Sequence, residues 1–145
     1  MNEENTSALT KEEEALLKKI EEKTRNEDPI LSSFKQLEGK PTDEMIEEWK
    51  QQVGEVFLIS LSDNETFVFR PLRRLEWRTM LKGIQGLDEQ KQSEAIVIKA
   101  CLWPELNSQS INMLTAGSVE AVKEMILQVS NFISPDVAMQ LVRKL

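Results

Sequence analysis

Residues 56–71 read VFLISLSDNETFVFRP, two runs of β-branched and aromatic residues joined by the turn residues SDN. This pattern predicts a β-hairpin over residues 55–70. In the second run, Phe67 and Phe69 are expected to face the same side of the strand. Because a lone two-stranded hairpin is only marginally stable in water, we expect the segments after Pro71 to cover one of its faces.

The 145-residue chain is acidic, and its net charge of −7 is unevenly distributed. Residues 1–50 carry 8 basic and 14 acidic side chains, residues 51–100 carry 7 of each, and residues 101–145 carry 3 and 4. Because an acidic chain is repelled by nucleic acids and by anionic lipids, we expect no nucleic acid and no membrane as partners. The single cysteine, Cys101, lies in an apolar run and is interpreted as a buried small side chain in a reducing cytoplasm.

Residues 1–40 are predicted to form an acidic helical arm followed by a linker. Thr10 and Glu13 match a capping box, which predicts a charged helix ending near Arg25. We interpret this helix as a solvated arm; the alternative is a segment that docks on a partner or on another copy. The linker is expected to contain one helical turn over residues 31–37.

A compact domain, residues 41–145, is expected to begin at Pro41. Thr42 is the predicted cap of a helix that carries Trp49 and ends before Gly54. After the hairpin, helices are predicted over residues 72–84, 88–102, 106–114, 119–132 and 136–144. The apolar residues expected to face the core include Leu75, Met125, Val137, Met139, Leu141 and Val142.

The predicted fold class is α+β and mainly helical. It consists of an acidic N-terminal helical arm, one β-hairpin and a compact C-terminal helical bundle.

The sequence carries few of the residues that enzymes need. It has no histidine, one cysteine and no glycine-rich phosphate-binding motif, so we expect no catalytic residues, no metal and no cofactor. The acidic runs Glu12 to Glu14 and Glu47-Glu48 are interpreted as solubilising charge on exposed helix faces. Asp63-Asn64-Glu65 are interpreted as turn residues instead of a calcium loop. We therefore predict that the protein is not an enzyme.

Two groups of residues are candidates for binding a partner. The first comprises Arg70, Arg74, Arg78 and Lys82, which recur at a spacing of four, so that the last three would line one exposed ridge. We interpret this ridge as a solvated face or a mate for the acidic arm of this chain or a neighbour; nucleic-acid binding by a small regulator is the less favoured alternative. The second group comprises Trp49, Trp77, Trp103 and Pro104. Tryptophans are most often core residues, but one beside a proline at a helix end could anchor a partner.

Four segments carry a family resemblance: PTDEMIEEWKQQVGEVFLISL, ETFVFRPLRRLEWRTML, EAIVIKACLWPE and AGSVEAVKEMILQVSNF. Together they resemble small tail assembly chaperones of contractile-tailed bacteriophages over residues 41–133, without the arm. The matching positions are Trp49, Phe69, Arg70, Pro71, Leu72, Glu76, Trp77, Trp103, Pro104, Glu105, Ala116, Gly117, Ser130 and Phe132.

The resemblance implies a non-enzymatic protein that binds the phage tape measure protein in the host cytoplasm. There it would keep this long helical client soluble until the tail tube polymerises around it. The alternative that the resemblance leaves open is a structural tail or baseplate component retained in the virion tail. Other tail proteins and a homo-oligomer also remain as alternative partners.

Overall fold

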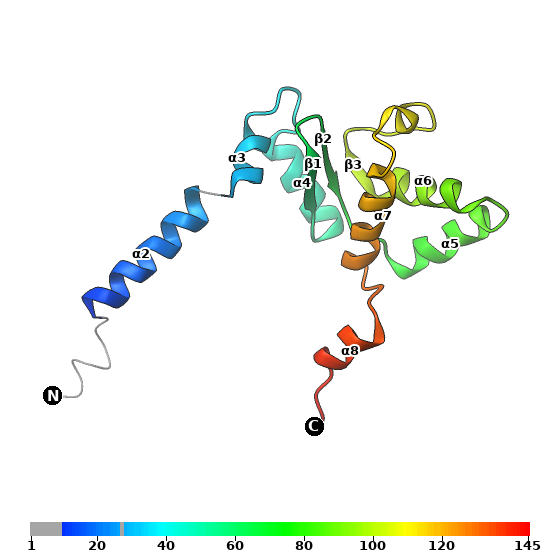
Figure 1. Ribbon diagram of the computed structural model, residues 1–145. Coiled ribbons are helices and arrows are strands. Elements are labelled where there is room, and N and C mark those ends of the chain that lie inside the picture. Colours follow the sequence, from blue (N-terminus) through cyan, green and yellow to red (C-terminus); the bar gives the residue numbers. More distant parts are fainter. Residues whose placement is uncertain (1–9, 27) are drawn as a thin grey trace. The chain divides into compact units, whose positions relative to one another are not determined.

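The computed structural model describes the backbone of residues 10–26 and 28–145, and the side chains of residues 10–19 and 28–145. The first nine residues of the expected arm lie outside this range. The fold is α+β and mainly helical, which confirms the fold class predicted from the sequence. The chain divides into two compact units at the bond between Lys40 and Pro41 (Figure 1).

The first unit contains α2 (Lys11–Asn26) and α3 (Pro29–Lys35). Thr10 caps α2, because its hydroxyl accepts a hydrogen bond of 3.1 Å from the backbone N–H of Glu13. One helical turn was predicted in the linker over residues 31–37, whereas α3 begins two residues earlier, at Pro29, and ends at Lys35. The Asp28 carboxylate accepts hydrogen bonds from the first turn, and Pro29 occupies the first helical position, where its missing N–H costs nothing.

The second unit begins with α4 (Asp43–Val53). The Thr42 hydroxyl accepts a 3.1 Å hydrogen bond from the N–H of Met45, as expected for the predicted cap. Gly54 ends the helix with a φ of 89°, a conformation that residues with a Cβ rarely adopt.

A three-stranded antiparallel sheet follows, in the order β1 (Phe57–Ser62), β2 (Glu65–Phe69) and β3 (Cys101–Trp103). The predicted hairpin supplies β1 and β2, with Phe57 opposite Phe69 and their ring centroids 5.8 Å apart. The prediction that helix 88–102 continues through Leu102 is wrong. Instead, α6 (Glu89–Ala100) ends at Ala100, and the next three residues pair with β2.

The side chains of β2 alternate in direction as expected, since Phe67 and Phe69 belong to the core cluster and Thr66 and Val68 do not. Every residue of β2 is nevertheless buried, and the strand lies between β1 and β3 in the sheet. The run AIVIKACL is apolar enough for either a buried helix or a strand, so its composition does not show where the helix ends.

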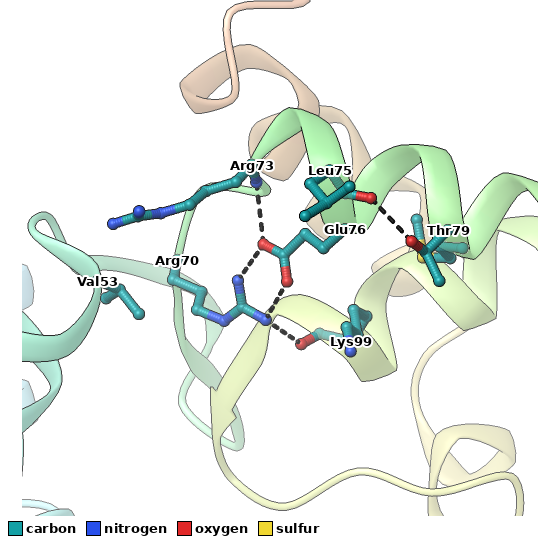
Figure 2. A pocket seen from close by; sticks show the side chains of 8 residues that line it. Val53, Arg70, Arg73, Leu75, Glu76, Thr79 and Lys99 are labelled. Atoms are coloured by element: carbon teal, nitrogen blue, oxygen red, sulfur yellow. Dashed lines mark hydrogen bonds and ion pairs between the residues drawn. The ribbon is translucent and has the colours of Figure 1, made fainter.

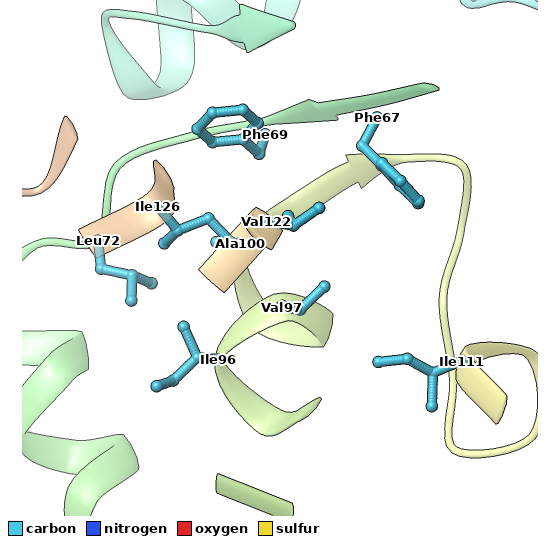
Figure 3. Close-up of a cluster of buried hydrophobic side chains, with 9 residues drawn as sticks. All are labelled: Phe67, Phe69, Leu72, Ile96, Val97, Ala100, Ile111, Val122 and Ile126. Carbon is cyan, nitrogen blue, oxygen red and sulfur yellow. The ribbon is translucent and has the colours of Figure 1, made fainter. Parts of the chain in front are cut away.

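Two helices, α6 and α7 (Ser118–Val129), pack on one face of the sheet. Figure 3 shows Phe67 and Phe69 of β2 pointing toward Val97 of α6 and Val122 and Ile126 of α7. Burial of each large apolar side chain of this kind contributes about 1.5–3 kcal/mol. This cluster holds the sheet at a fixed position against the two helices.

The remaining elements of this unit are α5 (Arg74–Ile84), the 3₁₀ helix η1 (Ser110–Met113) and α8 (Pro135–Leu141). Ser134 caps α8, because its hydroxyl accepts a hydrogen bond from the N–H of Val137, and Pro135 occupies the first helical position. The described chain contains no helix that is both long enough and apolar enough to cross a membrane.

Several residues predicted to face the core are exposed instead. Leu75 is 77% exposed because α5 turns Met80 and Ile84 inward, leaving Leu75 on the other side of the helix. The prediction that the apolar residues of α8 face the core is wrong, because this helix lies away from the sheet (Figure 1). The exposed apolar residues of α7, α8 and the C-terminus include Met125, Val137, Met139, Leu141 and Val142.

Candidate functional site

Arg70 lies at the end of β2 and binds the carboxylate of Glu76 in α5 (Figure 2). The two Arg70–Glu76 hydrogen bonds measure 2.6 and 3.1 Å, and the guanidinium also donates to the carbonyl oxygen of Lys99. Glu76 in turn accepts a 2.9 Å hydrogen bond from the N–H of Arg73. The hydrogen bond from Arg70 is the main cause of a lowered pKa for Glu76. Arg70 therefore fixes the start of α5 and does not extend the exposed ridge.

The other cations of the predicted ridge do lie along the exposed side of α5. Arg74, Arg78 and Lys82 are all exposed, and the described residues include no ion pair with any of them. These three residues are named the α5 ridge below. The ridge is a concentrated positive surface on a protein of net charge −7.

Trp77 points to the opposite side of α5 from the exposed Leu75 and is half-buried against Phe132. The two ring centroids lie 4.8 Å apart at an interplanar angle of 58°, a tilted geometry favoured by aromatic quadrupoles. A second contact joins the same two segments: the Ser130 hydroxyl, two residues before Phe132, accepts a 2.8 Å hydrogen bond from the N–H of Leu72, which lies just ahead of α5. A hollow of about 250 Å³ opens here, with Arg74 also in its wall. The structure thus brings together Arg74 and Trp77, two of the candidate residues.

The remaining candidates lie on other elements of the same unit. Trp49 is half-buried on α4. Trp103 pairs with Val68 at the edge of the sheet and precedes a cis peptide bond to Pro104, and both of these residues are half-buried. The partial burial of Trp103 and Pro104 is consistent with a structural role at the sheet edge. Such a role agrees with the interpretation that tryptophans are most often core residues.

A larger groove of about 720 Å³ lies on the other side of α5 (Figure 2). Its apolar lining comes from Val53, Leu75 and Met80, and its cationic lining includes Arg73 and Lys99. Glu76 also lines the groove, but its carboxylate is engaged by Arg70. The groove can hold an apolar side chain and an adjacent acidic group; among the described residues that line it, Glu76 is the one carboxylate.

Glu65 carries a buried carboxylate that was not predicted from the sequence. It was interpreted as a turn residue, yet it is the first residue of β2 and only 9% exposed. Its carboxylate accepts hydrogen bonds from the hydroxyl of Ser118 and, at 2.6 Å, from the N–H of Thr115. The Ser118 bond is the largest cause of a lowered Glu65 pKa. No local signal in the sequence marks this contact, because the partners are 50 or more residues away.

Cys101 is partly buried in β3, and burial raises the pKa of its thiol to about 11. A thiol with such a pKa is protonated at neutral pH and therefore a poor nucleophile or metal ligand. Among the side chains that the structure describes, no cluster of three or more acidic or cysteine residues could hold a metal ion.

The protein also exposes an apolar surface near the C-terminus that was not predicted from the sequence. Phe132 is 46% exposed, and Met139 and Leu141 are 71% and 70% exposed. We refer to residues 132–142 as the C-terminal apolar segment. It begins at the Trp77–Phe132 contact, so it continues directly from the hollow beside α5.

A scan against protein-family models and searches of curated proteins and of solved structures found no match to this chain.

Proposed function

We propose that this protein is a non-enzymatic tail assembly chaperone of a contractile-tailed bacteriophage. In this proposal it binds the tape measure protein in the host cytoplasm and keeps that client soluble until the tail tube forms around it. The proposal originates in the resemblance of residues 41–133 to such chaperones.

One observation carries the proposal beyond sequence likeness: the motif residues contact one another in space. Three contacts join them, namely the Arg70–Glu76 ion pair, the Leu72–Ser130 hydrogen bond and the Trp77–Phe132 ring contact. These residues come from the end of β2, from α5 and from the end of α7. Their convergence supports the view that the separate motifs describe one folded unit, and that unit is the part of the chain that resembles the family.

The C-terminal apolar segment is the surface that we assign to the client. A long helical protein whose apolar stripes are exposed aggregates unless another surface covers them. Met139 and Leu141 are both exposed, and the unbranched side chain of Met139 can adapt to apolar stripes of different shape. The acidic chain would also add like charge to the complex, which opposes association between complexes.

Co-expression tests the proposal. The tape measure protein encoded in the same genome is produced with and without this chain, and its soluble fraction and co-purification are measured. We expect a soluble complex only when both proteins are present. The proposal is contradicted if the tape measure protein is equally soluble alone and forms no complex.

The alternative function is a structural tail or baseplate component. The observation that favours it is the exposed apolar surface of α2 in the arm, where Leu16 and Leu17 are 59% and 44% exposed and could contact a neighbouring subunit. Quantitative mass spectrometry of purified particles separates the two functions. Stoichiometric amounts of this chain in mature virions would favour the structural component, and its absence would favour the chaperone.

A further inference from the structure

Helix α4 carries an acidic face that has no partner among the described residues. Asp43, Glu44, Glu47 and Glu48 are all exposed, and no ion pair within the described chain involves them. Two pairs of these residues repeat at a spacing of four, which places all four side chains on one side of the helix. We call this surface the α4 acidic face.

The α5 ridge has the opposite charge and the same periodicity. Arg74, Arg78 and Lys82 repeat at a spacing of four along an exposed side of α5. Both helices belong to the unit that begins at Pro41. One compact unit therefore presents two unpaired helix faces of complementary charge and matching spacing.

We propose that a second copy of this chain covers both faces, with the α4 acidic face of each copy against the α5 ridge of the other. In a two-fold symmetric pair each contact occurs twice, so a single copy supplies a partner for both surfaces at once. An unrelated acidic protein would cover the ridge alone and leave the carboxylates of α4 unpaired. Charge complementarity within one unit is thus the argument for self-association.

Apolar side chains beside the charged faces add to the contact. Leu75 adjoins the α5 ridge and is 77% exposed, and Met45 adjoins the acidic face and is 43% exposed. Val53 of α4 and Leu75 of α5 both line the groove of about 720 Å³. A second copy would remove part of this apolar surface from water.

The dependence of self-association on salt concentration tests whether charged faces hold the two copies together. Exposed ion pairs are individually weak and are screened by salt, so the proposed pair dissociates as ionic strength rises. The net charge of −7 makes the copies repel one another, and salt screens this repulsion. An association that did not depend on complementary charged faces would therefore become stronger as the salt concentration rises. The sign of the salt dependence therefore distinguishes the two cases. This inference is independent of the proposed client and function.

The test uses sedimentation equilibrium of the full-length chain and two charge-reversal variants. Glu47→Lys with Glu48→Lys alters α4 beyond its first turn, where the helix dipole has little effect, and Arg78→Glu with Lys82→Glu alters the ridge. We expect each variant alone to associate at least about tenfold more weakly than the parent chain. An equimolar mixture should recover association. The cations introduced on α4 of the first variant then meet the carboxylates introduced on α5 of the second, and the native α5 ridge of the first meets the native α4 acidic face of the second.

Net charge alone cannot produce that recovery. The two variants carry net charges of −3 and −11, so they repel each other overall. Matched controls with the same net charges are Glu12→Lys with Glu13→Lys in α2 and Arg143→Glu with Lys144→Glu near the C-terminus, all at exposed positions. Circular dichroism confirms that every variant is folded before its association is measured.

The proposal predicts self-association that weakens with salt, loss in both variants, recovery in their mixture and no comparable loss in the controls. It is overturned if the parent chain is monomeric at millimolar concentration, or if salt strengthens its association. It is also overturned if the mixture fails to associate or the controls lose association equally. Binding of DNA or RNA by the ridge with no self-association would assign the ridge to a nucleic acid instead.

Discussion

The two ends of β2 are tied to neighbouring segments by hydrogen-bonded carboxylates, whereas the C-terminal apolar segment exposes apolar side chains to solvent. At the ends of β2, carboxylates join the sheet to helical segments: Glu65 binds Thr115 and Ser118, and Glu76 binds Arg70. In the C-terminal segment, apolar side chains are left facing solvent. The first region therefore stabilises the fold, whereas the second contributes little to it and is the surface that we propose for the client. Mutations should therefore separate stability from partner binding.

The largest loss of stability is expected for Glu65→Ala. The substitution removes two hydrogen bonds to a carboxylate and leaves the Thr115 N–H and the Ser118 hydroxyl without their acceptor. We expect the free energy of unfolding to fall by about 2–4 kcal/mol, measured by urea denaturation. Asp63→Ala in the exposed turn of the same hairpin is the matched control and should change it by less than about 0.5 kcal/mol. Equal effects of the two substitutions would refute the anchoring role of Glu65.

A smaller loss is expected for Arg70→Met. The Arg70–Glu76 pair is partly exposed, with 15% and 24% of the two side chains accessible, so solvent screens part of its energy. The guanidinium nevertheless makes two hydrogen bonds to the carboxylate, and we expect a loss of about 1–2 kcal/mol in urea denaturation. Arg74→Met, four residues along and exposed, is the control. A loss at Arg74 as large as that at Arg70 would show that the ion pair contributes nothing specific.

The same two carboxylates predict a pH dependence of stability. The folded-state pKa values of Glu65 and Glu76 are lowered from the ordinary 4.5, so their contribution is present above pH 4.5. It is lost progressively as the pH falls through the lowered folded-state values. We expect the decline in unfolding free energy below pH 4.5 to be shallower in Glu65→Gln than in the parent chain. An identical acid slope in both proteins would show that Glu65 does not titrate differently on folding.

The smallest effect on stability is expected in the C-terminal apolar segment. Met139 and Leu141 are already about 70% exposed, so Met139→Ser with Leu141→Ser should change the free energy of unfolding by less than about 0.5 kcal/mol. The same double variant should bind the tape measure protein more weakly in a pull-down. Met113→Ser, which alters a methionine that is 86% exposed in η1, is the control for binding. Marked destabilisation by the double variant would mean that the segment belongs to the core.

Local features of the fold were predictable from the sequence because their physical causes are local. Thr10, Thr42 and Ser134 cap helices through their own side chains, and Gly54 ends α4 by its positive φ. The hairpin was likewise evident from two β-rich runs and a turn. Each of these predictions depended on residues within a few positions of one another.

The errors involve contacts between distant residues. The strand β3 was read as the end of a helix, because only its pairing with β2 distinguishes the two. Leu75 and Met139 are apolar at helical spacing, yet tertiary packing leaves them exposed. Among the candidate binding residues, the exposure of Arg74, Arg78 and Lys82 followed from periodicity. The engagement of Arg70 by Glu76 did not, because the ion pair depends on how β2 leads into α5.

Suppression of client aggregation is the most direct test of the chaperone proposal. Purified tape measure protein is diluted from denaturant with increasing amounts of this chain, and light scattering is recorded. We expect the parent chain and Met113→Ser to suppress scattering at stoichiometric ratios, and Met139→Ser with Leu141→Ser to leave it unsuppressed. Scattering that is unchanged by the parent chain, or suppressed equally by all three proteins, would contradict the assignment of the C-terminal apolar segment to the client.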